Sequence, residues 1–259
     1  MYFMELNGII IHYCDEGPRD GPIIVFSNSL GTDFRIWDEV TKILTSRYRV
    51  IRYDKRGHGL SSCPTAPYKM NDHIKDLVAL LDNLSVKNIT LVGLSVGGLI
   101  AQGITSLRPD LIKALVLCDT AHKILTDDIW NERIRTVENL GLDALADSTM
   151  ERWFSENFRK NYKPLLNGAR NMFTRTPVAG YSGTCAAIRD TDFTSAAKRI
   201  NCPTLCLVGD EDGSTPVGVV RELSKLIPNA NFDIIKEAGH IPCIEKPKIV
   251  AHKIMDFIE

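Results

Sequence analysis

The stretch Ile89-Thr90-Leu91-Val92-Gly93-Leu94-Ser95-Val96-Gly97-Gly98 decides the predicted fold. It begins as a run of β-branched and aliphatic residues, which is typical of a strand buried on both faces of a sheet. It ends in Gly-x-Ser-x-Gly and passes directly into residues 98–107, which have a helical pattern. So sharp a turn strains the backbone at the turning residue, and the flanking glycines have no Cβ that would clash there. The sequence therefore predicts that Ser95 stands at the carboxyl end of a strand, where its hydroxyl can act as a nucleophile.

Strand-like and helix-like segments alternate on both sides of this motif. The expected strands are short and mostly apolar, and they occupy residues 3–14 (with a turn at Asn7-Gly8), 23–26, 48–53, 115–118, 203–208 and 231–235. Segments with helical spacing include residues 37–46, 71–84 and 247–258. This alternation predicts an α/β protein with a mostly parallel central sheet and helices on both faces.

Residues 124–190 interrupt the alternation, because they have helical patterns and contain no convincing strand. We interpret them as a helical cap inserted into one α/β core, which would comprise residues 1–123 and 191–259. The inserted segment is expected to fold over the carboxyl ends of the strands.

The composition excludes several classes of partner. The 259 residues carry a net charge of −1, and they contain neither a basic block nor an apolar run long enough to span a membrane. We therefore expect no nucleic-acid partner and no membrane partner. The seven cysteines are irregularly spaced and include no Cys-x-x-Cys pair, so neither a metal nor a cofactor is expected. Free thiols and an N-terminus without a secretory pattern predict a reducing, cytoplasmic location.

A serine hydroxyl becomes a useful nucleophile when a base accepts its proton and an acid orients that base. His240 is the candidate base, because it lies in the loop between the last expected strand and the final helix. The candidate acid follows the strand at 203–208, where Asp210, Glu211 and Asp212 compete. We choose Asp212 for its place in the turn before Gly-Ser-Thr-Pro, and Asp210 remains the alternative. The resulting chain order of Ser, Asp, His is the one expected on such a sheet.

An oxyanion formed by attack of the serine needs two aligned hydrogen-bond donors. The backbone N–H of Val96, directly after the nucleophile, is one candidate. The other is the N–H of Leu30, in the loop of small residues that follows the strand at 23–26. Together with the serine, the base and the acid, these donors make up a predicted acyl-transfer centre.

Several short segments spread over the chain are distinctive. They are Phe26–Asp33 (FSNSLGTD), Arg52–Gly59 (RYDKRGHG), Gly93–Gly98 (GLSVGG), Cys118–His122 (CDTAH), Cys185–Asp190 (CAAIRD), Gly209–Pro216 (GDEDGSTP) and Ala238–Cys243 (AGHIPC). Together they resemble the α/β-hydrolase superfamily and, within it, the 3-oxoadipate enol-lactonases. The Ser-Asn-Ser-Leu-Gly loop and the Cys-Ala-Ala-Ile-Arg-Asp stretch are the more family-specific parts, and they lie in both the core and the cap.

The resemblance implies an α/β-hydrolase fold and hydrolysis of 3-oxoadipate enol-lactone to 3-oxoadipate, in bacterial catabolism of aromatic compounds such as protocatechuate and catechol. The partner would be a small lactone that carries a carboxylate. An arginine can grip a carboxylate bidentately, and Arg133 lies one helical turn after Trp130, which would wall the ring. Arg189 is a second candidate cation.

Other classes of function remain open. One is another carboxylesterase, or a C–C bond hydrolase, with the same triad, because the cap decides the substrate. Another is a non-catalytic ligand receptor with the hydrolase fold, which the complete set of Ser95, Asp212 and His240 disfavours. Dehalogenation on this fold uses an aspartate nucleophile, whereas position 95 is serine.

Overall fold

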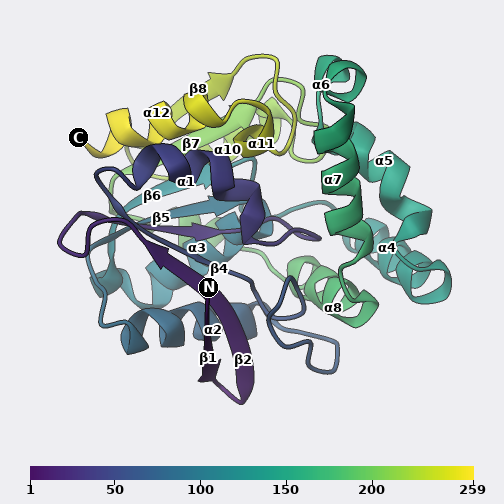
Figure 1. Ribbon diagram of the computed structural model, residues 1–259, viewed down its shortest axis with the longest axis horizontal. Coiled ribbons are helices and arrows are strands. Elements are labelled where there is room, and N and C mark those ends of the chain that lie inside the picture. Colours follow the sequence, from purple (N-terminus) through teal and green to yellow (C-terminus); the bar gives the residue numbers. More distant parts are fainter.

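An eight-stranded sheet lies at the centre of the computed structural model, which describes residues 1–259 (Figure 1). Its strands are β1 (Tyr2–Leu6), β2 (Ile9–Glu16), β3 (Ile23–Ser27), β4 (Arg49–Tyr53), β5 (Ile89–Leu94), β6 (Ile112–Cys118), β7 (Thr204–Gly209) and β8 (Asn231–Ile235). They are arranged in the order β1-β2-β4-β3-β5-β6-β7-β8, and every pair is parallel except β1–β2 and β2–β4. The prediction of a mostly parallel sheet is confirmed.

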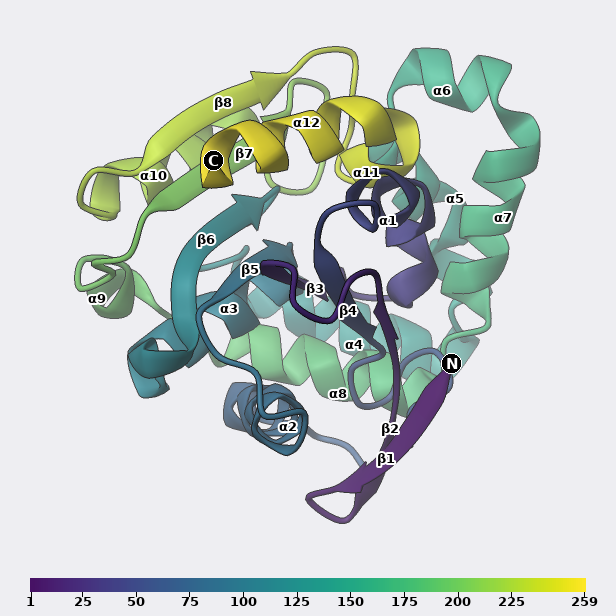
Figure 2. The same cartoon turned by 60° about the vertical axis from the view of Figure 1, so that its left-hand side comes forward.

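Helices cover both faces of this sheet. Those outside the expected cap are η1 (Phe34–Trp37), α1 (Asp38–Leu44), α2 (Met70–Asn83), α3 (Val96–Leu107), η2 (Pro109–Leu111), α9 (Thr194–Ala197), α10 (Val217–Leu226), α11 (Pro242–Glu245) and α12 (Pro247–Ile258). On one face α1 packs against α12, and on the other α3 packs against α2 and α9 (Figure 2). The central strand β5 is therefore buried along its whole length, as its apolar run predicts.

The helix α2 shows how the sequence pattern determines burial. Its buried side chains include Ile74, Leu77 and Leu81, which recur at helical spacing, while Lys75 and Asp82 are exposed. The apolar stripe packs on the neighbouring helix α3 and the polar stripe meets solvent. The observed helix begins and ends one residue before the predicted bounds.

A group of helices between β6 and β7 forms the region that we call the cap. Its members are α4 (Asp127–Leu140), α5 (Asp143–Trp153), α6 (Glu156–Asn161), α7 (Lys163–Thr174) and α8 (Val178–Arg189). α4 packs against α8, and α5 packs against α7 (right in Figure 1). The division into a core of 1–123 and 191–259 and a cap of 124–190 stays our interpretation of this arrangement. None of the chain's helices combines the length and the apolar character needed to cross a bilayer.

The cap and the core meet at a contact between two glycines. Gly57, in the loop after β4, has φ +73°, which a residue with a side chain adopts only with strain. A Cβ atom added to Gly180 of α8 would stand 2.0 Å from the carbonyl oxygen of Gly57. Backbone therefore packs directly on backbone here, and a larger residue fits only if α8 moves away from the loop.

We predict that Gly180→Ala lowers the free energy of unfolding by roughly 1–3 kcal/mol, the usual cost of overpacking. Thermal or urea denaturation of the purified variant measures the change. The matched control is Gly168→Ala on α7, where nothing lies within 4 Å of the added Cβ. There alanine favours the helix and should raise stability by roughly 0.5–1 kcal/mol. A Gly180→Ala variant as stable as the wild type would contradict the close contact.

Candidate active site

Ser95 stands at the sharp turn between β5 and α3. Its backbone has φ +57° and ψ −118°, a strained conformation for a residue with a side chain. The end of β6 and the segment after it hold Ser95 there, because the Ser95 N–H donates to the Cys118 carbonyl at 3.0 Å and the Thr120 hydroxyl donates to the Ser95 carbonyl at 2.7 Å. A Cβ on Gly97 would lie 2.1 Å from the carbonyl oxygen of Ser27, so the glycine lets α3 approach β3. The strand-to-helix turn expected from the sequence is present.

Asp212 lies in the loop after β7, and each oxygen of its carboxylate accepts hydrogen bonds from neighbouring groups. Oδ1 accepts the N–H groups of Ser214 at 2.7 Å and Thr215 at 2.9 Å. Oδ2 bonds the Thr215 hydroxyl at 2.7 Å and the His240 ring at 2.9 Å. Burial favours the neutral acid, but the interaction with His240 and these bonds outweigh it and hold the pKa of Asp212 below its usual value. Asp212 is therefore the ionised carboxylate beside the histidine.

The two rival acids of this loop point elsewhere. Asp210 pairs with Lys236 at 3.4 Å, and Glu211 accepts the backbone N–H of Glu156 at 3.2 Å. Neither carboxylate bonds the ring of His240. The geometry thus favours Asp212, the residue chosen from the turn pattern.

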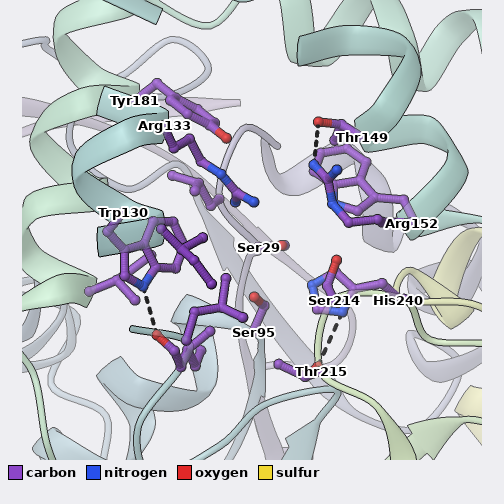
Figure 3. A pocket seen from close by; sticks show the side chains of 17 residues that line it. Ser29, Ser95, Trp130, Arg133, Thr149, Arg152, Tyr181, Ser214, Thr215 and His240 are labelled. Atoms are coloured by element: carbon purple, nitrogen blue, oxygen red, sulfur yellow. Dashed lines mark hydrogen bonds between the residues drawn. The ribbon is translucent and has the colours of Figure 1, made fainter. Parts of the chain in front are cut away.

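His240 follows β8 and connects Asp212 to the cavity described below. Because a carboxylate only accepts, the proton of the bond between the two side chains sits on His240 Nδ1. Nε2 is then the nitrogen of a neutral ring that is left to act as a base. Ser95 and His240 line the same cavity (Figure 3). They are not hydrogen-bonded to each other in this structure, and such contacts often tighten only when substrate binds.

The loop after β3 is held by two side chains from the loop after β4. The buried Nζ of Lys55 donates to the Ser29 carbonyl at 2.5 Å, and His58 Nε2 accepts the Gly31 N–H at 3.0 Å. Burial lowers the pKa of Lys55 to about 7 and depresses the pKa of His58. These contacts fix the backbone on either side of Leu30.

Both predicted oxyanion donors are unoccupied by other groups of the chain. The N–H of Leu30 makes no hydrogen bond, and Leu30 lines the cavity. Val96 is the first residue of α3, so its N–H has no acceptor within its own helix. Donors in these positions are available to a ligand oxygen near Ser95.

The C-terminal end of α5 docks on the loops after β7 and β8. The carbonyl of Arg152 accepts the N–H of Gly213 at 3.1 Å, and the carbonyl of Trp153 accepts the N–H of Ile241 at 3.3 Å. Backbone hydrogen bonds therefore set where this end of the cap stands relative to the acid and the histidine.

A cavity of about 210 Å³ separates the cap from these residues (Figure 3). Ser95 and His240 contribute to it from the core. Its cap side combines apolar groups with two arginines and consists of Ile124, Leu125, Ile129, Trp130, Arg133, Thr149, Arg152, Trp153, Tyr181 and Ile188. A small, largely apolar cavity with a few charged groups suits a compact ligand with a charged end.

Arg133 and Arg152 reach into this cavity from opposite sides, and neither has an acidic partner (Figure 3). Arg133 lies over the ring of Trp130 at 4.8 Å, and Arg152 donates to the hydroxyl of Thr149 at 3.1 Å. Burial and then repulsion by Arg133 lower the pKa of Arg152, although a guanidinium stays charged. The pair therefore forms a positive site that an anion would stabilise. The sequence analysis identified Arg133 and missed Arg152, whose neighbours in the chain give no signal of its role.

Trp130 and Arg189 were also candidates for substrate binding, and only the first of them lines the cavity. Trp130 lines the cavity, with its indole N–H bound to the Ile124 carbonyl at 2.6 Å. Arg189 does not line it, because its guanidinium pairs with Asp190 at 2.7 Å and bonds Asn131 at 2.7 Å. Arg189 is thus already neutralised.

Comparison with known proteins places this geometry in a family. Residues 22–247 match the family described as alpha/beta hydrolase fold. The 3-oxoadipate enol-lactonase 2 of Acinetobacter baylyi is 31% identical over 97% of this chain and 94% of its own length. The 3-oxoadipate enol-lactonase 1 of the same organism is 34% identical over 90% and 86%.

A solved structure gives the same result. The enol-lactonase from Burkholderia xenovorans LB400 superimposes with a TM-score of 0.96 at 33% identity, and the match covers 99% of each chain. The chain therefore belongs to the α/β-hydrolase family, and it is similar to enol-lactonases over nearly its whole length, as its sequence motifs indicated.

Proposed function

We propose that this chain is a 3-oxoadipate enol-lactonase in which Ser95 is the nucleophile, His240 the base and Asp212 the acid that orients it. One observation carries the proposal: two arginines without acidic partners reach into a small cavity that also contains the serine and the histidine. A neutral ester has no negatively charged group that two arginines could bind. The enol-lactone is a compact ring with a carboxylate on its side arm, and it matches both the apolar walls and the positive charge.

The first half of the proposed reaction opens the ring. Ser95 Oγ attacks the lactone carbonyl while His240 Nε2 accepts the hydroxyl proton, and Asp212 stabilises the imidazolium that forms. The N–H groups of Leu30 and Val96 donate to the oxyanion. Cleavage of the ring C–O bond leaves an acyl-enzyme and an enolate, which takes up the proton held by His240 and becomes a ketone, so that the histidine is a neutral base again. Such a leaving group needs little help from a general acid.

The second half releases the product. Water gives a proton to His240 and attacks the acyl carbonyl, and the oxyanion again lies at the two backbone donors. Collapse of this intermediate frees Ser95, which regains its proton from the histidine. The product carries a second carboxylate where the ester bond was.

The arginines would hold the side-arm carboxylate during both steps. A guanidinium binds a carboxylate through paired N–H groups, which fixes the orientation of the ligand as well as attracting it. Anchoring one end of a small ring restricts how the other end meets the serine. Trp130 would form one wall for the ring, with Arg133 already stacked on it.

The setting of the proposed reaction follows from the relatives and the thiols. Two relatives are named 3-oxoadipate enol-lactonases, which supports a role in the catabolism of aromatic compounds. All seven cysteines are free thiols, which supports a reducing and hence cytoplasmic compartment.

A comparison of substrates separates this proposal from its rivals. The rate constants to measure are those for the enol-lactone, for a neutral aryl ester and for a C–C hydrolase substrate. We expect the highest kcat/KM for the lactone. A preference for either of the other two would assign the same triad to a general carboxylesterase or to C–C bond hydrolysis.

We predict that Ser95→Ala lowers kcat by on the order of 10⁴-fold or more on every substrate, as removal of a triad nucleophile does elsewhere. The reason is that no acyl-enzyme can form. Steady-state kinetics of the purified variant measure the loss. The matched control is Ser148→Ala on the exposed face of α5, which should behave as wild type. Near-normal turnover by the Ser95 variant would rule out the mechanism.

We predict that Arg133→Ala and Arg152→Ala each reduce kcat/KM for the carboxylated lactone by roughly 10-fold or more, since a charge-assisted hydrogen bond contributes about 1.5–3 kcal/mol. The same variants should change the rate on a neutral aryl ester little. Arg135→Ala is the control, because this exposed arginine of α4 pairs with Glu132 on the outer surface. Equal losses on both substrates would refute the carboxylate-binding role.

A further inference from the structure

Asp119 is a buried acid that the mechanism above does not use. It follows β6 with φ +46°, a conformation that Asp and Asn tolerate better than most residues, and it is fully buried. Its Oδ1 accepts the Gly209 N–H at 2.9 Å. No donor reaches its Oδ2, although that atom is buried as well. An ionised carboxylate with one bare oxygen in such a place is costly.

Asp119 also lies directly beside the pair formed by Asp212 and His240. One side-chain ligand atom of each of these three buried residues lies within 4.8 Å of the other two. Two carboxylates buried together do not both ionise, because the first charge raises the cost of the second. Asp212 is the one that Ser214 and Thr215 stabilise as an anion.

The proton therefore belongs on Asp119. Burial, and then the charge of Asp212, raise the pKa of Asp119 well above its usual value. A protonated Oδ2 changes from an acceptor without a donor into a donor that needs an acceptor. The carboxylate of Asp212 is the acceptor beside it.

The other titratable groups around Asp119 support this state. Cys118 precedes it on β6 and Cys243 approaches from α11, and burial raises the pKa of both thiols, so both are neutral. Glu245 of α11 accepts the Gly239 N–H at 2.7 Å, and its charge adds to the repulsion that keeps Asp119 protonated.

A bound metal ion is the alternative explanation of three clustered ligand atoms. Asp212 Oδ2 and His240 Nδ1 bond each other at 2.9 Å. A metal between them would break the contact that orients the base, whereas a proton on Asp119 leaves it in place. The geometry therefore favours the proton.

We propose that Asp119 is a neutral carboxylic acid that donates from Oδ2 to the carboxylate of Asp212 and acts as a positioning residue of the hydrolytic site. The inference rests on the proposed roles of Asp212 and His240 but not on the identity of the substrate. The donated proton offsets part of the negative charge that faces the imidazole. It thereby limits how strongly the protonated, inactive form of the base is stabilised.

The experiment compares Asp119→Asn with Asp119→Ala. The readout is the pH dependence of kcat/KM for 4-nitrophenyl acetate, an ester that has no carboxylate for Arg133 and Arg152 to bind. The acid limb of this pH profile reports the protonation of the base in the free enzyme. Asparagine keeps the shape, tolerates positive φ and donates an amide N–H to Asp212, so the acid limb should stay where it is in the wild type. Alanine donates no hydrogen bond to Asp212, so the midpoint of the acid limb should rise by roughly half a pH unit to one pH unit. Asp110→Asn, an exposed acid paired with Arg108, controls for loss of a charge far from the site.

Two results would overturn the inference. If Asp119 were an anion, both substitutions would remove a negative charge near the ring, and the midpoint would fall by roughly one unit or more in each. If Asp119 only filled space, Asp119→Ala would lower Tm and leave the acid limb unmoved. Should the alanine variant fail to fold, the asparagine variant still decides whether Asp119 is neutral, and Asp119→Leu, of similar size but without a donor, replaces alanine in the test of the hydrogen bond to Asp212. Poor turnover of the lactone beside normal turnover of the aryl ester would count against the proposed substrate and not against Asp119.

Discussion

The parallel pairing of β5, β6, β7 and β8 is the constraint on which the site depends. Strands that run side by side in one direction end at the same edge of the sheet, so the loops that follow them meet there. The backbone hydrogen bonds between neighbouring strands continue past the strand ends. The backbone N–H of Ser95 donates to the Cys118 carbonyl, and the backbone N–H of Asp119 donates to the Leu207 carbonyl. The backbone N–H of Asp210 in turn donates to the carbonyl of Ile235. The register of the sheet thus sets the spacing of Ser95, Asp119, Asp212 and His240, whose catalytic roles we propose.

Local patterns were enough to predict the strands, most helices and the residues proposed for the triad. Ser95 sits in a motif whose glycines are required by close backbone contacts, and Asp212 sits in a turn that supplies its own N–H donors. His240 follows the last strand of a regular alternation. In each case the physical reason for the residue lies within a few positions of it in the chain, and a single sequence contains that information.

Arg152 and Asp119 could not be predicted in this way, because their surroundings come from distant segments. Arg152 reaches the cavity because the end of α5 is bound to the loop after β7. Asp119 has an unusual environment because Asp212 arrives beside it from a strand far along the chain. Their residue types are ordinary for a helix end and a loop. The register of the sheet brings Asp119 beside Asp212, and the docking of the cap on the core brings Arg152 into the cavity.

The cap and the core are coupled through Arg152 itself. Its carbonyl accepts an N–H from the loop that carries Asp212, while its guanidinium lies in the cavity near Thr149. Repulsion between its charge and that of Arg133 is present before any ligand arrives. An anion that relieves this repulsion acts on the same residue that contacts the acid loop. In the proposed reaction, binding of the side arm and alignment of the base would therefore involve one segment of backbone, the end of α5 and the loop that it contacts.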